Sequence, residues 1–192
     1  MKKKEKRLLD STIHIKINLE TRNGVAISEK KAVTAVHGKY SVGQVMDIVN
    51  IHGHSKHGTI NFVLYEASKH DIAVVELTDF DAFDHFIPFR TQPLEIDKEL
   101  RIIGLRDVGN GEYTESVRRT AMEESIKDTS IFHATYYATE GLSGAGAVVT
   151  ITEGGCCYVV GVYVGKHDDT DALSEEETPK KKRSKKQTWR SE

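Results

Sequence analysis

Hydrophobic and polar residues alternate in short runs along most of this chain. Ile13, Ile15, Ile17 and Leu19 each alternate with polar residues, which is the period-two pattern of a half-buried β-strand. Further runs rich in β-branched residues occupy positions 24–28, 32–36, 42–51, 59–65, 72–77, 99–105, 113–120, 130–137, 147–151 and 157–164. Short strands at this spacing predict an all-β protein, built as a sandwich or as barrels.

A polar stretch with scattered aromatic residues separates two sets of predicted strands. It covers residues 78–93 and contains Pro88 and Pro93, which interrupt regular strands. In the second set, residues 115–126 also fit a helix, although their apolar positions are sparse. This helical alternative overlaps the strand predicted at 113–120, and the pattern leaves both open.

The charges are strongly segregated along the 192 residues, although the net charge is only −2. Residues 1–7 have a net charge of +4, and residues 8–167 have a net charge of −6. Residues 168–177 contain six acidic side chains, whereas residues 180–192 contain seven basic ones against one acidic. A mildly acidic body with 38% apolar residues predicts a folded domain and gives no general reason to expect nucleic-acid binding.

The two ends of the chain differ from the body in composition. Residues 1–11 form a basic extension in which only Leu8 and Leu9 follow the basic run, too few for the apolar core of a signal peptide. Residues 167–192 have almost no apolar side chains, which predicts a disordered, acidic-then-basic tail. No run approaches the roughly 18 apolar residues of a membrane helix. We therefore expect a cytoplasmic protein that contacts no membrane.

The basic run from Lys180 to Lys186 allows two interpretations. Together with Pro179 it resembles a nuclear import signal, and it also suits contacts with nucleic-acid phosphates. A solvated charged tail is the alternative, because most charge runs have no specific partner.

The two cysteines, Cys156 and Cys157, are adjacent in the sequence. Neighbours on an extended chain point to opposite faces and do not easily form a disulfide. Without a disulfide framework, we expect a reducing compartment. Cys157 lies within an apolar run, which favours a core thiol over a nucleophile.

Three short segments carry residue types that together suggest hydrolytic chemistry. The run Val-Thr-Ala-Val ends at His37, and Asp71 opens the apolar run Ile-Ala-Val-Val-Glu-Leu. Ser143 lies inside the glycine-rich segment Gly-Leu-Ser-Gly-Ala-Gly, which leads into another apolar run. The three residues follow in the order His, Asp, Ser, with spacings of 34 and 72 residues.

These segments resemble the chymotrypsin-like serine proteases, whose pattern is Thr-Ala-Ala-His, then Asp-Ile-Ala-Leu, then Gly-Asp-Ser-Gly-Gly-Pro. The resemblance covers roughly residues 12–166. It implies two six-stranded antiparallel Greek-key barrels, at about 12–80 and 95–166, with the active site in the cleft between them. The function it implies is that of a serine endopeptidase.

The resemblance also assigns the roles of a catalytic triad. A serine hydroxyl is a poor nucleophile near neutral pH unless a base removes its proton, and imidazole has a suitable basicity. The implied roles are His37 as base and acid, Asp71 as the orienting carboxylate and Ser143 as the nucleophile. The backbone N–H groups of Gly141 and Ser143 would form the oxyanion hole. No metal or organic cofactor is implied.

Several positions depart from the digestive enzymes of this family, among them Ala145 and Gly146, which replace the usual Gly-Pro. Leu142 stands where those enzymes place an aspartate that binds a new N-terminal ammonium group, so we expect no activation by N-terminal insertion. Gly38 replaces the cysteine that follows the catalytic histidine there. Compact, disulfide-free chains of this kind resemble viral polyprotein-processing proteases and bacterial stress proteases, and the short chain is closer to the viral group. Processing of a polyprotein is therefore one expected role.

In that family the primary specificity pocket is lined by the segment before the serine and by the strand after it. Those segments map to Tyr137 and Thr139, and to Tyr163 and Val164. The position six residues before Ser143 holds Tyr137 rather than aspartate, which disfavours a preference for Lys or Arg in the peptide or protein substrate. The alternative is that both tyrosines belong to the core.

Other functions stay open at this point. Ala145 would be strained at a positive φ, so the oxyanion hole could be collapsed and the protein a catalytically inactive, protease-like binding module. An RNA-binding protein that acts through its basic tail is a further alternative. His52, His54 and His57 suggest a metal site, but a solvated turn is favoured because no acidic or cysteine ligand is nearby in the sequence.

Overall fold

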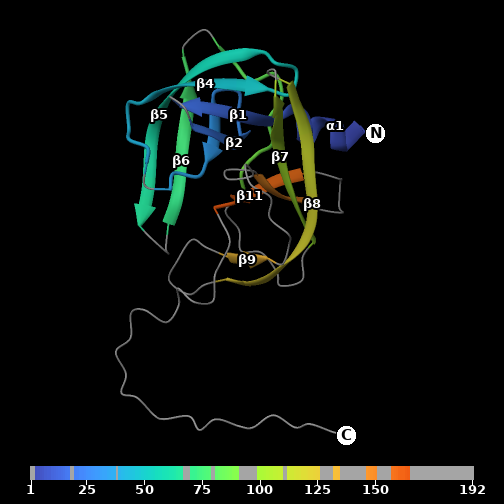
Figure 1. The fold of residues 1–192 in the computed structure, drawn as a ribbon. Helices are drawn as coiled ribbons and strands as arrows, with labels where there is room; N and C mark the ends of the chain where they lie inside the picture. Colours follow the sequence, from blue (N-terminus) through green and yellow to red (C-terminus); the bar gives the residue numbers. More distant parts are fainter. Residues whose placement is uncertain are drawn as a thin grey trace, which may run out of the picture.

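The computed structural model of the chain describes residues 3–17, 20–37, 39–66, 70–78, 81–90, 99–109, 112–125, 132–134, 146–150 and 157–164. Its elements, shown in Figure 1, are α1 (Lys3–Asp10), β1 (Thr12–Ile17), β2 (Glu20–Ala26), β3 (Lys31–Thr34), β4 (Val45–Asn50), β5 (Ser55–Glu66), β6 (His70–Leu77), β7 (Glu99–Gly109), β8 (Glu112–Ser125), β9 (Phe132–Ala134), β10 (Gly146–Thr150) and β11 (Cys157–Val162). Strands dominate, as the alternation of hydrophobic and polar residues predicts.

The first six strands close into an antiparallel barrel in the order β1-β2-β3-β6-β5-β4. The ring closes because β1 pairs with β2 on one side and with β4 on the other. Strands β3 and β6, which are not neighbours in the sequence, pair directly, with Thr34 opposite Ala73. A closed six-stranded barrel in the first half of the chain confirms that part of the predicted fold.

The second half of the chain contributes a five-stranded sheet in the order β11-β10-β7-β8-β9. Its pairs are antiparallel, and the longest of them joins β7 to β8. The described residues form an open sheet, so a second closed barrel stays a prediction. Figure 1 shows this sheet beside and below the barrel, and β7 lies against β1 and β2.

Two elements differ from what the sequence pattern indicates. The helical alternative for residues 115–126 is wrong, because β8 pairs with β7 along most of its length. Conversely, α1 is a helix that the pattern did not predict. Its last turn buries Leu8 and Leu9, which are 3% and 5% exposed. In the part of the chain that is described, no helix has the length and apolar character to cross a membrane.

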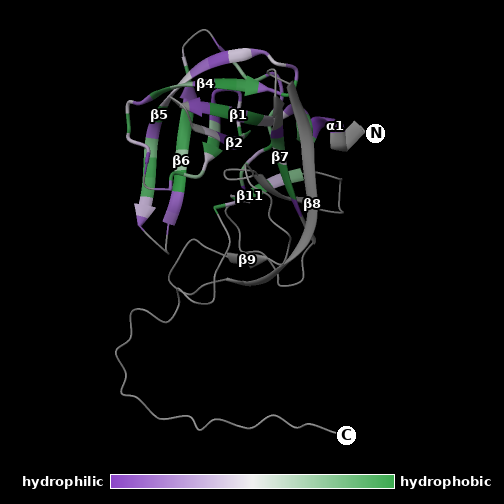
Figure 2. Cartoon of the chain, in the orientation of Figure 1, coloured by the Kyte–Doolittle hydropathy of each residue, from purple (hydrophilic) through white to green (hydrophobic). Residues whose placement is uncertain are grey.

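The barrel interior is filled by alternate residues of its strands. In β6, Ala73, Val75 and Leu77 are buried inside the barrel, whereas Ile72 and Val74 point outward. Figure 2 shows hydrophobic residues along β1, β4 and β6, while β5 is mostly hydrophilic. The interior cluster consists of Ile13, Ile15, Ala26, Ala32, Val36, Tyr40, Met46, Ile48, Ile60, Ala73, Val75, Leu77 and Phe83.

A second apolar cluster joins the outer face of the barrel to the second sheet and to α1. Its buried members are Leu8, Leu9, Val25, Val33, Ile87, Ile103 and Val159. A polar contact crosses the same junction. The Asn23 side chain donates to the Leu105 carbonyl at 3.0 Å and accepts from the Leu105 N–H at 2.6 Å. The barrel and the sheet are thus fixed to one another by apolar packing and by a buried amide.

Candidate catalytic site

His37 lies just beyond the end of β3, where the chain leaves the barrel wall. Ala35 and Val36, the two residues before it, are fully buried and anchor the chain. The backbone of His37 is left-handed, with a φ of 50°. This region costs a non-glycine residue about 1–2 kcal/mol, so the surrounding contacts must hold the histidine there. Its side chain is 30% exposed, and can therefore meet a ligand.

Asp71 is the second residue of β6, at the end of the barrel to which β3 runs. It has the same parity along β6 as Ala73 and Val75, whose side chains point inside the barrel. Because Thr34 is paired with Ala73, the next residues of the β3 segment lie across from Asp71. Its side chain is only 12% exposed. The strand register, rather than proximity in sequence, therefore brings His37 and Asp71 together.

The two oxygens of the Asp71 carboxylate contact different groups. Oδ1 accepts the backbone N–H groups of Val36 at 2.7 Å and of His37 at 2.8 Å. Oδ2 lies 3.0 Å from the Nδ1 atom of the His37 ring. An ionised carboxylate accepts hydrogen bonds only, so this contact assigns the proton to Nδ1 and leaves Nε2 with its lone pair. A neutral imidazole in this tautomer can accept a proton at Nε2.

Opposing influences set the acidity of Asp71. Burial raises the pKa of its carboxyl above the ordinary value of 3.8, because the charged form loses hydration. The hydrogen bond from the Val36 amide and the positive charge of Arg22 both lower the pKa, and so offset part of the rise. Arg22 is a residue of this site that the sequence analysis did not identify.

Ser143 and three other predicted site residues lie outside the described part of the chain. They are Gly141 of the oxyanion hole and the pocket residues Tyr137 and Thr139, and the neighbours Leu142 and Ala145 lie outside it as well. Strand β10 begins at Gly146, three residues after Ser143, and runs between β7 and β11. It also lies against β2 of the barrel. The serine and its oxyanion hole therefore stay predictions, although the strand that follows them is placed beside the barrel.

The other predicted pocket residues, Tyr163 and Val164, follow directly after β11 and are partly buried. Their position is compatible with a pocket or with the core, and the pocket assignment stays a prediction. Cys157, the first residue of β11, is partly buried and packs against the second apolar cluster. This packing agrees with the interpretation of Cys157 as a core thiol.

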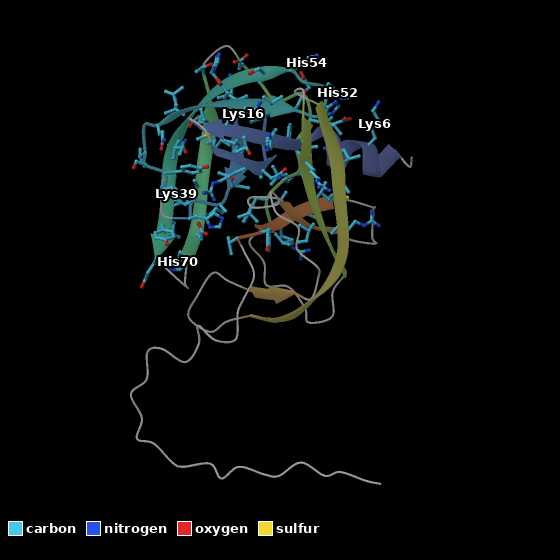
Figure 3. All side chains as sticks on the ribbon, in the orientation of Figure 1. Lys6, Lys16, Lys39, His52, His54 and His70 are labelled. Carbon is cyan, nitrogen blue, oxygen red and sulfur yellow. The ribbon has the colours of Figure 1, made fainter. Side chains whose placement is uncertain are left out.

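The histidines that suggested a metal site lie in and beside the turn between β4 and β5. The Nε2 atom of His52 is 3.2 Å from Oδ1 of Asp10, and the Nδ1 atom of His57 is 2.7 Å from Oδ1 of Asp47. Within the described ranges, no three histidine, cysteine or acidic side chains are arranged to hold a metal ion. In Figure 3, His52 and His54 lie near one end of the barrel and His70, the neighbour of Asp71, near the other.

Solved structures with a similar fold include two of one mycobacterial protease and one of a protease domain. The Rv3671c protease of M. tuberculosis, in its inactive form, matches with a TM-score of 0.58 and 17% identity over 82% of this chain and 79% of that one. An inactive serine-to-alanine mutant of the same protein matches with a TM-score of 0.59 and 16% identity, over 84% of this chain and 78% of that one. The MamO protease domain of Magnetospirillum magneticum matches with a TM-score of 0.55 and 15% identity, over 85% and 88%.

These similarities concern the fold. No protein-family model and no curated protein sequence shows significant similarity to this chain. At 15–17% identity, the solved structures show that the chain shares the architecture of protease domains.

Proposed function

We propose that this protein is a serine endopeptidase that hydrolyses peptide bonds through an acyl-enzyme. The observation that carries the proposal is the geometry of Asp71 and His37. A largely buried carboxylate, held by two backbone amides, directs its second oxygen to Nδ1 of a partly exposed histidine at 3.0 Å. This is how a triad aspartate fixes the tautomer of a catalytic base.

In the first half of the proposed reaction, His37 acts as a base and then as an acid. Nε2 of His37 takes the proton from the Ser143 hydroxyl while Oγ attacks the carbonyl carbon of the peptide bond. The carbonyl oxygen becomes an oxyanion, which accepts hydrogen bonds from the N–H groups of Gly141 and Ser143. The imidazolium then gives its proton to the leaving amine as the C–N bond breaks. The products are a free amine and an ester on Ser143.

In the second half, water takes the place of the serine hydroxyl. His37 removes a proton from water, the resulting hydroxide adds to the ester carbonyl, and the same oxyanion site holds the charge. The proton returns to Oγ of Ser143 as the ester bond breaks. The second product is a carboxylic acid, and the enzyme regains its starting protonation state. No cofactor is needed, because acid–base and nucleophilic steps suffice.

The relatives by fold support the same proposal, since two of them are described as a protease and a protease domain. We further propose a compact enzyme that acts without N-terminal insertion. Leu142 precedes the proposed nucleophile, and its aliphatic side chain cannot bind an ammonium group. Polyprotein processing is the role we propose for an enzyme with these features.

A peptide-library cleavage profile tests the proposal. The purified chain and its Ser143→Ala variant are incubated with a library of unmodified peptides, and new termini are identified by mass spectrometry. We expect defined cleavage sites with the wild type and none with Ser143→Ala. Ser55→Ala, which changes an exposed serine at the start of β5, serves as the matched control and should cleave like the wild type. Equal cleavage by wild type and Ser143→Ala, or none by either, would contradict the proposal.

A further inference from the structure

Arg22 is a buried cation inside the barrel. It lies on β2, directly opposite Ile15 of β1, and only 7% of its surface is exposed. Paired residues of antiparallel strands point to the same face, and Ile15 belongs to the interior cluster. Ala26, at the same parity on β2, belongs to that cluster as well. Arg22 therefore projects into the interior of the barrel, where an ion is costly to place.

An aromatic ring lies against the guanidinium of Arg22. Its Cζ atom lies 5.0 Å from the centroid of the Tyr40 ring, which is within the range of a cation–π contact. Tyr40 is itself 7% exposed and comes three residues after His37. The planar guanidinium can stack on this ring, whereas a lysine ammonium would contact it as a point charge. The same loop thus carries both the proposed catalytic base and the support for Arg22.

The buried charge of Arg22 acts on Asp71. Both residues share the strand parity of side chains in the interior cluster, Arg22 with Ala26 and Asp71 with Ala73. The positive charge of Arg22 favours the ionised form of the Asp71 carboxyl, against the effect of burial. Other described titratable groups also lie near Asp71. His37 contacts it and His70 precedes it in β6. On the neighbouring strand β5, Tyr65 is paired with Asp71 and Glu66 with His70. Arg22 is a cation whose charge lowers the pKa of Asp71.

We infer that Arg22 is a positioning residue for the proposed catalytic pair: its guanidinium, held against Tyr40 inside the barrel, keeps Asp71 ionised so that the carboxylate can orient His37. The catalytic meaning of this inference rests on the proposed peptidase function. The same positive charge opposes formation of the His37 imidazolium. Both effects favour the state in which Asp71 is charged and His37 is neutral, and they extend that state to lower pH.

Two substitutions separate the charge of Arg22 from its volume. Arg22→Met removes the charge and leaves an apolar side chain of similar length in the barrel interior. Replacing a buried charged residue by an apolar one of similar volume is often neutral for stability. Arg22→Lys keeps the charge. Arg90→Met is the matched control, because Arg90 lies over the Tyr158 ring at 5.9 Å but is not among the charges that act on Asp71. Thermal unfolding of each variant shows that it is folded.

NMR titration in a Ser143→Ala background measures the inference without any need for activity. The midpoints of the Asp71 carboxyl carbon and of the His37 ring are followed against pH. In Arg22→Met we expect both midpoints to rise, because a positive charge that favours the ionised carboxylate and the neutral imidazole is gone. In Arg22→Lys and Arg90→Met we expect midpoints close to those of the parent. Unchanged midpoints in a folded Arg22→Met variant would overturn the inference.

The pH dependence of kcat/KM distinguishes a failed inference from a failed function. With active enzyme, Arg22→Met should move the acid limb to higher pH by a similar amount and keep the plateau at high pH within a few-fold. A uniform loss at every pH, with an unmoved acid limb, would show a merely structural role and overturn the inference. If the wild type cleaves no peptide while the Arg22→Met midpoints still rise, the peptidase proposal fails and the electrostatic role of Arg22 stands.

Discussion

Asp71 contacts His37 twice, once through the backbone and once through the ring. Its Oδ1 accepts the His37 N–H at 2.8 Å, and its Oδ2 lies 3.0 Å from Nδ1. The backbone contact holds the histidine in its left-handed conformation, and the ring contact sets which nitrogen carries the proton. A single carboxylate thereby fixes the position and the tautomer of the proposed base.

Asp71→Asn separates the two contacts. The amide oxygen of asparagine can still accept the backbone N–H groups, but the negative charge that stabilises an imidazolium is lost. We expect kcat to fall by roughly 10⁴-fold, as in other triads of this type, with an unchanged fold. Steady-state kinetics on a cleaved peptide measures the effect, and circular dichroism checks the fold. A variant that keeps kcat within a few-fold of wild type would show that Asp71 has no part in catalysis.

The raised pKa of Asp71 predicts how stability depends on pH. Burial raises the pKa of the folded carboxyl above its ordinary 3.8, with partial offsets from the Val36 amide and Arg22. The folded state therefore binds this proton more tightly than the unfolded chain. The stability that Asp71 contributes is full below about pH 3.8 and is lost as the pH rises through the folded pKa.

The same Asp71→Asn variant measures this dependence, because its side chain stays neutral. The free energy of unfolding of wild type minus that of Asp71→Asn should decrease as the pH rises from acid to neutral. Urea unfolding of both proteins over that range gives the difference directly. A difference that grows with pH would mean that the folded state prefers the charged carboxylate, and it would reverse the stated direction of the pKa.

The left-handed backbone of His37 predicts a stability difference between two inactive variants. His37→Ala keeps a Cβ atom at a φ of 50°, whereas His37→Gly removes it. The strain of about 1–2 kcal/mol exceeds the backbone entropy of about 0.5–1 kcal/mol that glycine loses on folding. We expect His37→Gly to be the more stable, by roughly 0.5–1 kcal/mol. Chemical denaturation compares them, and a His37→Ala variant that is the more stable by about 0.5–1 kcal/mol would show that the φ stores no strain.

The two hydrogen bonds of Asn23 are expected to stabilise the junction between the barrel and the second sheet. Asn23→Ala leaves the N–H and the carbonyl of Leu105 without their side-chain partner in a buried place. We expect a loss of about 2 kcal/mol in the free energy of unfolding. The exposed Asn61 gives a matched control, since Asn61→Ala should change stability by less than about 0.5 kcal/mol. Similar small losses in both would show that the junction does not depend on this amide.

Much of the strand content follows from the sequence because side chains alternate along a strand. Ile13 and Ile15 fill the barrel interior at the predicted period. The alternation does not separate a long polar strand from a helix, and for β8 it is the pairing with β7 that decides between them. Helix α1 depends on tertiary packing of Leu8 and Leu9, and a two-residue apolar run carries no periodic signal.

The site shows a similar division. His37 and Asp71 stand at strand ends in a recognisable order, and the structure brings them together. Arg22 carries no such signal: it precedes the predicted strand at 24–28, and a charged residue there is typical of a surface. Because β2 begins at Glu20, Arg22 lies on the same face of the strand as Gly24 and Ala26, which is the interior face of the barrel.

Covalent labelling with a fluorophosphonate probe tests the central claim most directly, namely that His37 and Asp71 activate Ser143. The probe reacts with a serine only when a neighbouring base removes its proton, and peptide mapping by mass spectrometry locates the adduct. We predict one adduct, on Ser143, in the wild type, and none in Ser143→Ala or His37→Ala. Equal labelling of wild type and Ser143→Ala, or an adduct on another residue, would contradict the account.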